Sequence, residues 1–170
     1  MCKFTTIILL CGAFCIFSTQ VSAQNADIEI LRTINGSQSN GLRQYSKFMS
    51  NNTAVVAVST PLVMGIAAII DKNDDLLKSA LYTGVSIGVS GVLAYSMKKL
   101  VNRPRPYTAY PDITAYQLES SSSFPSAHTS VAFATATALS LKYPKWYVIA
   151  PSYFWACSVG YSRMNHFIYL

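Results

Sequence analysis

The sequence has few charged residues. Asp, Glu, Lys and Arg make up 12% of its 170 residues, and 51% of the residues are hydrophobic, whereas charged residues are about 25% of an ordinary globular domain. This balance predicts either a helical membrane protein or one domain with a large buried core. The formal net charge is +6, but the basic residues form no long run or stripe of the kind typical of nucleic-acid binders. We therefore expect no nucleic-acid partner.

Cysteine is scarce where a disulfide would need it. Cys2, Cys11 and Cys15 all lie near the N-terminus, which leaves Cys157 alone in an apolar stretch. Because a lone cysteine forms no internal disulfide, we interpret Cys157 as core filler. The sequence also has no internal repeat and no glycine pattern of the kind that binds nucleotides.

The first 23 residues have the pattern of a secretory signal peptide. Lys3 supplies a positive charge, Phe4 to Phe17 is apolar, and Val21-Ser22-Ala23 fits the small-x-small rule for cleavage. We expect a signal peptide at 1–23, an exported protein, and one domain at 24–170. The alternative is an uncleaved anchor helix, although the apolar run is shorter than the roughly 20 residues of a membrane span.

Apolar segments separated by polar turns predict an all-α protein. The expected helices cover 26–50, 54–70, 79–97, 127–141 and 146–161. Asn51-Asn52-Thr53 is interpreted as a cap between the first two of these helices. The runs 54–70 and 79–97 carry no charge, and the glycines of the second run would let helices approach closely in a membrane. A buried bundle in a soluble protein is the alternative.

The order of helices and loops predicts which loops meet. Successive helices joined by short connections run antiparallel, so the connections at 71–78 and 142–145 should share one end of the bundle. The long loop at 98–125 and the segment Ser162-Arg163 should share the other end. Residues far apart in the sequence would then converge there.

The residues expected at that end are suited to binding an anion. Lys98, Arg105 and Arg163 are cationic, and Ser126 precedes an apolar run as a helix N-cap would. The N–H groups of a helix N-terminus bind anions, and His128 would lie in the first turn as a proton donor. Taken singly, each piece also fits an ordinary helix cap or a charge at a helix end.

Together the pieces resemble a known family. Lys98-x6-Arg105-Pro106, then Pro125-Ser126-Ala127-His128, then Ser162-Arg163 resembles the tripartite pattern of the type 2 phosphatidic acid phosphatases. These enzymes are related to bacterial acid phosphatases and vanadium haloperoxidases. Their pattern reads Lys-x6-Arg-Pro, Pro-Ser-Gly-His and Ser-Arg-x5-His-x3-Asp.

The resemblance implies an antiparallel helical bundle with a haloperoxidase-like core and a metal-independent phosphatase that needs no cofactor. Lys98, Arg105 and Arg163 would neutralise the phosphate, Ser126 and the N–H of Ala127 would bind its oxygens, and the imidazole of His128 would protonate the leaving group. The family's third-motif histidine attacks phosphorus and forms a phosphohistidine. The substrate would be a phosphomonoester or a pyrophosphate, on a small molecule or a lipid.

The chain departs from the pattern in two places. Ala127 stands where the family has glycine, and Tyr169 stands where the nucleophilic histidine should be, with His166 three residues early. We expect a chain that is incomplete at its carboxy terminus and lacks the last helix of the core. The nucleophile is left unassigned, and His166 is not expected to serve.

These departures keep a second function open, a non-catalytic membrane protein that binds phosphate or phospholipid. We expect the protein to be membrane-associated, with its site facing the periplasm or the outside of the cell. A soluble periplasmic protein is the alternative. The oligomeric state is left open.

Overall fold

The structure, a computed structural model, describes residues 29, 33, 39–105 and 122–166. These residues form the helices α3 (Asn40–Ile70), α4 (Asp74–Val101), α6 (Ala127–Lys142) and α7 (Trp146–His166). No strand occurs within these ranges, so the expected all-α fold is confirmed. The predicted signal peptide at 1–23 lies outside the described residues.

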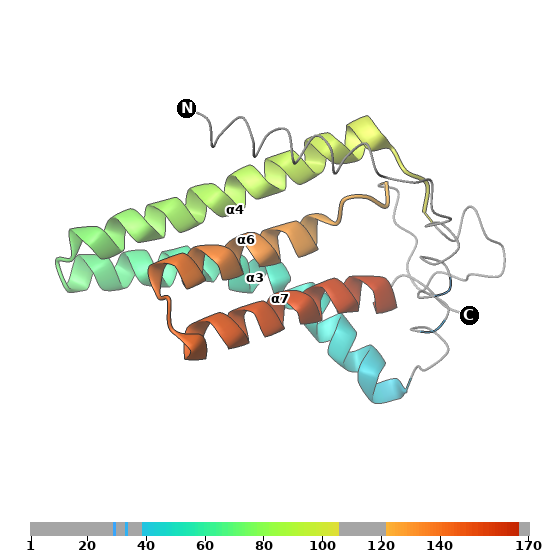
Figure 1. Ribbon diagram of the computed structural model, residues 1–170, viewed down its shortest axis with the longest axis horizontal. Coiled ribbons are helices and arrows are strands. Elements are labelled where there is room, and N and C mark those ends of the chain that lie inside the picture. Colours follow the sequence, from blue (N-terminus) through green and yellow to red (C-terminus); the bar gives the residue numbers. More distant parts are fainter. Residues whose placement is uncertain (1–28, 30–32, 34–38, 106–121, 167–170) are drawn as a thin grey trace, which may run out of the picture.

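Helix α6 occupies the centre of the bundle. It packs against α4 on one side and α7 on the other, and it also contacts α3. Figure 1 shows α4, α6 and α7 side by side with α3 crossing behind them. Successive helices run antiparallel, so the C-terminal ends of α4 and α7 lie at the same end of the bundle as the N-terminus of α6 (Figure 1).

The predicted break between residues 50 and 54 is wrong, because α3 runs without interruption through this segment. Asn52 Nδ2 donates to Phe48 O at 2.8 Å and Thr53 Oγ1 donates to Met49 O at 2.8 Å. These side chains therefore bond back to the preceding turn of the same helix instead of capping a new one. Pro61 also lies inside α3, and Pro151 lies inside α7, without ending either helix.

Helices α3 and α4 are long and apolar enough to cross a membrane. Their lengths correspond to about 46 Å and about 42 Å, against a hydrocarbon core of about 30 Å. Only 22% of the most apolar window of α3 and 11% of that of α4 are buried inside the protein. These helices therefore expose their apolar side chains outward, as a lipid-facing helix does and a soluble core helix does not.

Small residues form the contacts between helices. A Cβ added at Gly84 would lie 3.8 Å from Pro61 Cβ of α3, and one added at Gly91 would lie 3.9 Å from Val131 Cγ2 of α6. Two of the three glycines predicted to favour close approach therefore lie at helix interfaces, whereas Gly88 has no such neighbour within 4 Å. Both distances are ordinary van der Waals separations, so alanine also fits at these positions.

The buried core is made of small side chains and hydroxyl groups. Ala132, Ala136, Ala156 and Val159 are completely buried between α6 and α7. The interpretation of Cys157 as core filler is wrong, because this residue is exposed on α7. Buried threonines satisfy their hydroxyls within their own helix, as Thr135 does by donating to Val131 O at 2.9 Å. Such bonds remove the cost of burying a polar group, so the helices can pack closely through polar as well as apolar small residues.

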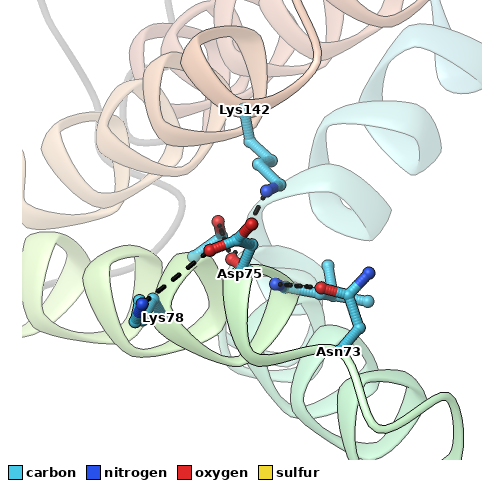
Figure 2. Close-up of polar contacts among 6 residues, drawn as sticks. Asn73, Asp75, Lys78 and Lys142 are labelled. Atoms are coloured by element: carbon cyan, nitrogen blue, oxygen red, sulfur yellow. Dashed lines mark hydrogen bonds and ion pairs between the residues drawn. The ribbon is translucent and has the colours of Figure 1, made fainter.

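One end of the bundle is held by a contact between α6 and α4. Lys142 Nζ, in the last turn of α6, donates to Asp75 O in the first turn of α4 at 3.3 Å, as Figure 2 shows. Asp75 also pairs with Lys78 at 3.8 Å on the exposed surface, and the side chain of Asn73 caps α4. The predicted meeting of the 71–78 and 142–145 connections is confirmed by this contact.

We expect the tight alanine interface to resist larger side chains. Replacing Ala136 with Leu forces extra atoms into a filled space and should lower the free energy of unfolding by about 1–3 kcal/mol. Ala150→Leu, on the exposed surface of α7, is the matched control and should change it by less than about 0.5 kcal/mol. Unfolding in detergent measures both, and equal effects would contradict the assigned interface.

Candidate functional site

The C-terminal end of α4 delivers the first basic cluster. Lys98 lies in the last turn of α4, and Asn102 ends the helix in a left-handed conformation with φ of 42°. Asparagine adopts this conformation more readily than most residues because its short polar side chain bonds locally. The N–H of Asn102 still donates to Lys98 O at 3.1 Å. The chain then leaves the helix at Arg103 and reaches Arg105, which is partly buried.

Two serines tie this segment to the one that precedes α6. Ser122 Oγ donates to Lys98 O at 2.8 Å. Ser123 N and Ser123 Oγ donate to Arg103 O at 3.0 and 3.1 Å, and the same hydroxyl lies 3.0 Å from Pro104 O. The serine run at 120–123 thus has a structural role at its described end. It holds the basic segment after α4 beside the start of α6.

Ser126 caps the N-terminus of α6, as predicted. Its side-chain oxygen accepts from Thr129 N at 3.4 Å and from Thr129 Oγ1 at 3.0 Å. A hydroxyl has two acceptor positions and one proton, so with both positions occupied, the Ser126 hydroxyl can offer only its proton to a further group. The N–H groups of Ala127 and His128, in the first helical turn, have no acceptor within the helix.

Contacts between the helices show how high along the bundle axis the segments with the predicted site residues lie. Gly91 of α4 lies opposite Val131 of α6. Along the bundle axis, Lys98 lies about 10 Å beyond Gly91 on α4. Ser126 lies about 7 Å beyond Val131 at the start of α6, in the same direction. The two residues therefore lie within a few ångströms of the same level.

The same geometry places α7. A Cβ at Gly160 would lie 3.5 Å from Thr129 Cγ2, so Gly160 lies opposite Thr129. Along the bundle axis, Arg163 lies about 4.5 Å beyond Gly160 on α7. Ser126 lies the same distance beyond Thr129, in the same direction. Lys98, Ser126 and Arg163 therefore lie at similar heights along the bundle axis, at the end of the bundle where α6 begins.

Helix α3 holds the arginine of α7. Arg163 Nη1 donates to Ser50 Oγ at 2.9 Å, and Ser50 is only 3% exposed. A guanidinium has several donors in a rigid fork, so a bond to a buried hydroxyl helps to fix its plane. Nearby, Asn165 is buried on α7 and donates from Nδ2 to Tyr161 OH at 3.3 Å.

Acidic residues lie away from the candidate site. Those of α4 and of the turn before it, Asp71, Asp74 and Asp75, lie at the opposite end, where they are mixed with lysines such as Lys78 and Lys142. The site end carries Lys98, Arg105 and Arg163 and, within 98–105, 122–130 and 159–166, no acidic residue. An anion at the α6 N-terminus therefore meets positive charges and the positive end of a helix dipole.

The predicted site residues fall as follows. His128 lies in the first turn of α6 and is partly buried, like Lys98, Arg105 and Arg163. The backbone of α7 ends at His166, while Tyr169 lies outside the described residues. Among the described residues, no group of three or more His, Cys, Asp or Glu side chains could hold a metal ion.

Sequence reasoning missed Ser50 and Thr129. Thr129 had a recognisable signal, because a polar residue three positions after an N-cap serine completes a capping pair. Ser50 had none, since it lies 113 positions from Arg163 and nothing in its local sequence marks it.

Comparison with known proteins identifies the family. A family model described as the PAP2 superfamily matches residues 79–166, just over half of the chain. The chain belongs to the PAP2 superfamily. The matched range includes all the predicted site residues but leaves out α3, and with it Ser50.

Among solved structures, the chain is similar to the crystal structure of a transmembrane PAP2-type phosphatidylglycerolphosphate phosphatase from Bacillus subtilis. The TM-score is 0.69 at 22% sequence identity, over 98% of this chain and 82% of that one. At this identity the likeness shows a shared fold. The search of curated proteins gave no match.

We expect Ser126 to contribute to stability through its cap. Ser126→Ala removes the acceptor for Thr129 and should lower the free energy of unfolding by about 1 kcal/mol, whereas Ser126→Asp keeps an acceptor and should lower it much less. Ser140→Ala, whose hydroxyl bonds Ala136 O within α6, is the control. Denaturation in detergent measures all three, and a loss in Ser126→Asp equal to that in Ser126→Ala would contradict the cap.

Proposed function

We propose that this protein binds the phosphate group of a phosphate-bearing lipid and that its site is built for metal-independent hydrolysis of the phosphate ester or pyrophosphate. The observation that carries this proposal is that Lys98, Ser126 and Arg163 lie at similar heights at the end of the bundle where α6 begins, with His128 in the first turn of α6. Membership of the PAP2 superfamily supports the same reaction class.

The charges match a phosphate group. Lys98, Arg105 and Arg163 neutralise the anion, and positioned cations also stabilise the charge that develops as the bond to the leaving group breaks. The Ser126 hydroxyl and the N–H of Ala127 donate to phosphate oxygens. Ser126 is suited to this because its acceptor positions are already occupied by Thr129.

His128 is proposed as the general acid. It lies in the first turn of α6, two residues after Ser126, where a phosphate bound at the helix N-terminus would present its leaving oxygen. Protonation of a departing alkoxide by a positioned imidazole typically contributes about 10²–10⁴ to the rate.

We propose a membrane location with the site outside the cytoplasm. Two helices are long and apolar enough to span a bilayer, and the signal peptide proposed at 1–23, followed by one domain at 24–170, would direct export. The similar solved structure is that of a transmembrane phosphatase of a phospholipid, which supports a lipid as the substrate class.

A second function is favoured by one residue. Tyr169 stands at the position of the family's nucleophilic histidine, and a phenol does not replace an imidazole in forming a phosphohistidine. With no nucleophile, the same cations and helix N-terminus would hold a phospholipid headgroup without turning it over. We assign no described residue as the nucleophile.

Turnover distinguishes the two functions. The purified protein, assayed with p-nitrophenyl phosphate and with phosphatidic acid in mixed micelles, should release phosphate, and His128→Ala should lower the rate by about 10²–10⁴. His166→Ala is the control and should have no effect on the rate. Phosphate binding without release would support the binding protein, and absence of both would contradict the site.

The contact between α3 and α7 gives a second test. Ser50→Ala frees the Arg163 guanidinium from its buried partner, and we expect affinity for inorganic phosphate to fall about tenfold, or about 1.4 kcal/mol. Ser59→Ala is the matched control, because Ser59 lies exposed on the same helix and bonds within it. Calorimetric titration measures both variants, and unchanged affinity in Ser50→Ala would contradict the positioning of Arg163 by α3.

A further inference from the structure

A groove lies between α4 and α6, below the candidate site. Its volume is about 410 Å³, within the range of about 300–1,000 Å³ found for small-molecule sites. Leu93, Ala94 and Met97 line it from α4, and Ser130 and Ala134 line it from α6. Its walls are mainly apolar, with a few hydroxyl groups.

The groove opens onto the phosphate site. At its upper end it is bounded by Met97 and Pro125, which directly precede Lys98 and Ser126 in the sequence. An anion held by Lys98 and Ser126 would therefore lie at the mouth of an apolar groove. Positive charge at one end and apolar walls along the rest match a molecule with an anionic head and a hydrocarbon tail.

The length of the groove fits one leaflet of a membrane. From Ser86 to Met97, its limits on α4, the helix rises about 16 Å. This is half of the roughly 30 Å hydrocarbon core of a bilayer. A second cavity of about 400 Å³ continues along the same seam from Ser86 towards Lys142, and it lies deeper than one leaflet reaches.

The groove is accessible from the side. Val89 and Leu93, which line the groove from α4, are 52% and 57% exposed, and α4 is apolar enough to span a membrane. Bilayer lipids would contact this helix directly, so a lipid can enter the groove sideways without leaving the hydrocarbon.

We propose that the α4–α6 groove binds one acyl chain of the lipid whose phosphate lies at the α6 N-terminus. This inference rests on the proposed function. It adds the place of the lipid tail and predicts that substrates with an acyl chain long enough to fill the groove are preferred over soluble phosphate esters.

Photo-crosslinking tests the inference. The full chain is placed in phosphatidylcholine nanodiscs with phosphatidic acid that carries a diazirine in the middle of one acyl chain. Adducts should map to the segments 86–97 and 130–134. Phosphatidylcholine carrying the same diazirine should label them at least about fivefold less, because it lacks the exposed phosphate monoester that anchors the probe.

Two variants sharpen the test. Ser90→Trp fills the groove and should lower labelling by the phosphatidic acid probe about fivefold. The affinity of the same variant for inorganic phosphate should stay unchanged. Val92→Trp, on the exposed face of α4 and outside the groove, is the matched control. It should lower neither the labelling nor the affinity for inorganic phosphate. If Ser90→Trp fails to fold, the positions of the adducts on the unaltered chain still test the inference.

Several results would overturn the inference. Equal labelling by both lipids would show that the groove holds only bulk lipid, and adducts spread over α3 would show that the tail lies elsewhere. Disulfide-linked dimers of Ser90→Cys, in a background in which Cys2, Cys11, Cys15 and Cys157 are all replaced by Ser, would show a second copy of the chain in the groove. If the protein binds no inorganic phosphate, the proposed function itself fails, whereas phosphate binding without groove adducts contradicts this inference alone.

Discussion

The site depends on where α6 begins relative to its neighbours. Gly91 of α4 faces Val131 of α6, and Gly160 of α7 faces Thr129 of α6, so these pairs set the register of α6 against α4 and α7. This packing brings the N-terminus of α6 to the level at which the other two helices carry their cations. A shift of one turn along either interface would move a cation by about 5.4 Å, which is more than a hydrogen bond to a shared anion tolerates.

The small size of the core side chains makes this positioning possible. Alanines at the α6–α7 interface, and threonine hydroxyls that bond within their own helices, allow the helices to approach closely. The same topology keeps acidic residues away from the candidate site, since the α3–α4 turn with Asp71 lies at the far end.

Much of this could be predicted from the sequence, because apolar runs mark helices and antiparallel order places their ends. The cap at Ser126 had a local signal. The break predicted at Asn52 and Thr53 was wrong, because these side chains bond to the preceding turn, and sequence does not show which partner a polar side chain will choose. Ser50 was not predictable, since its role depends on Arg163, which is distant in the sequence and brought near only by packing.

The central claim is that cations from separate segments act on one anion, and a double-mutant cycle on inorganic phosphate affinity tests it most directly. The cycle combines Arg105→Gln and Arg163→Gln. If both guanidiniums contact the same phosphate, the double variant should lose less affinity than the sum of the single losses, with a coupling of at least about 1 kcal/mol. Strict additivity, or single variants that bind phosphate normally, would contradict the account.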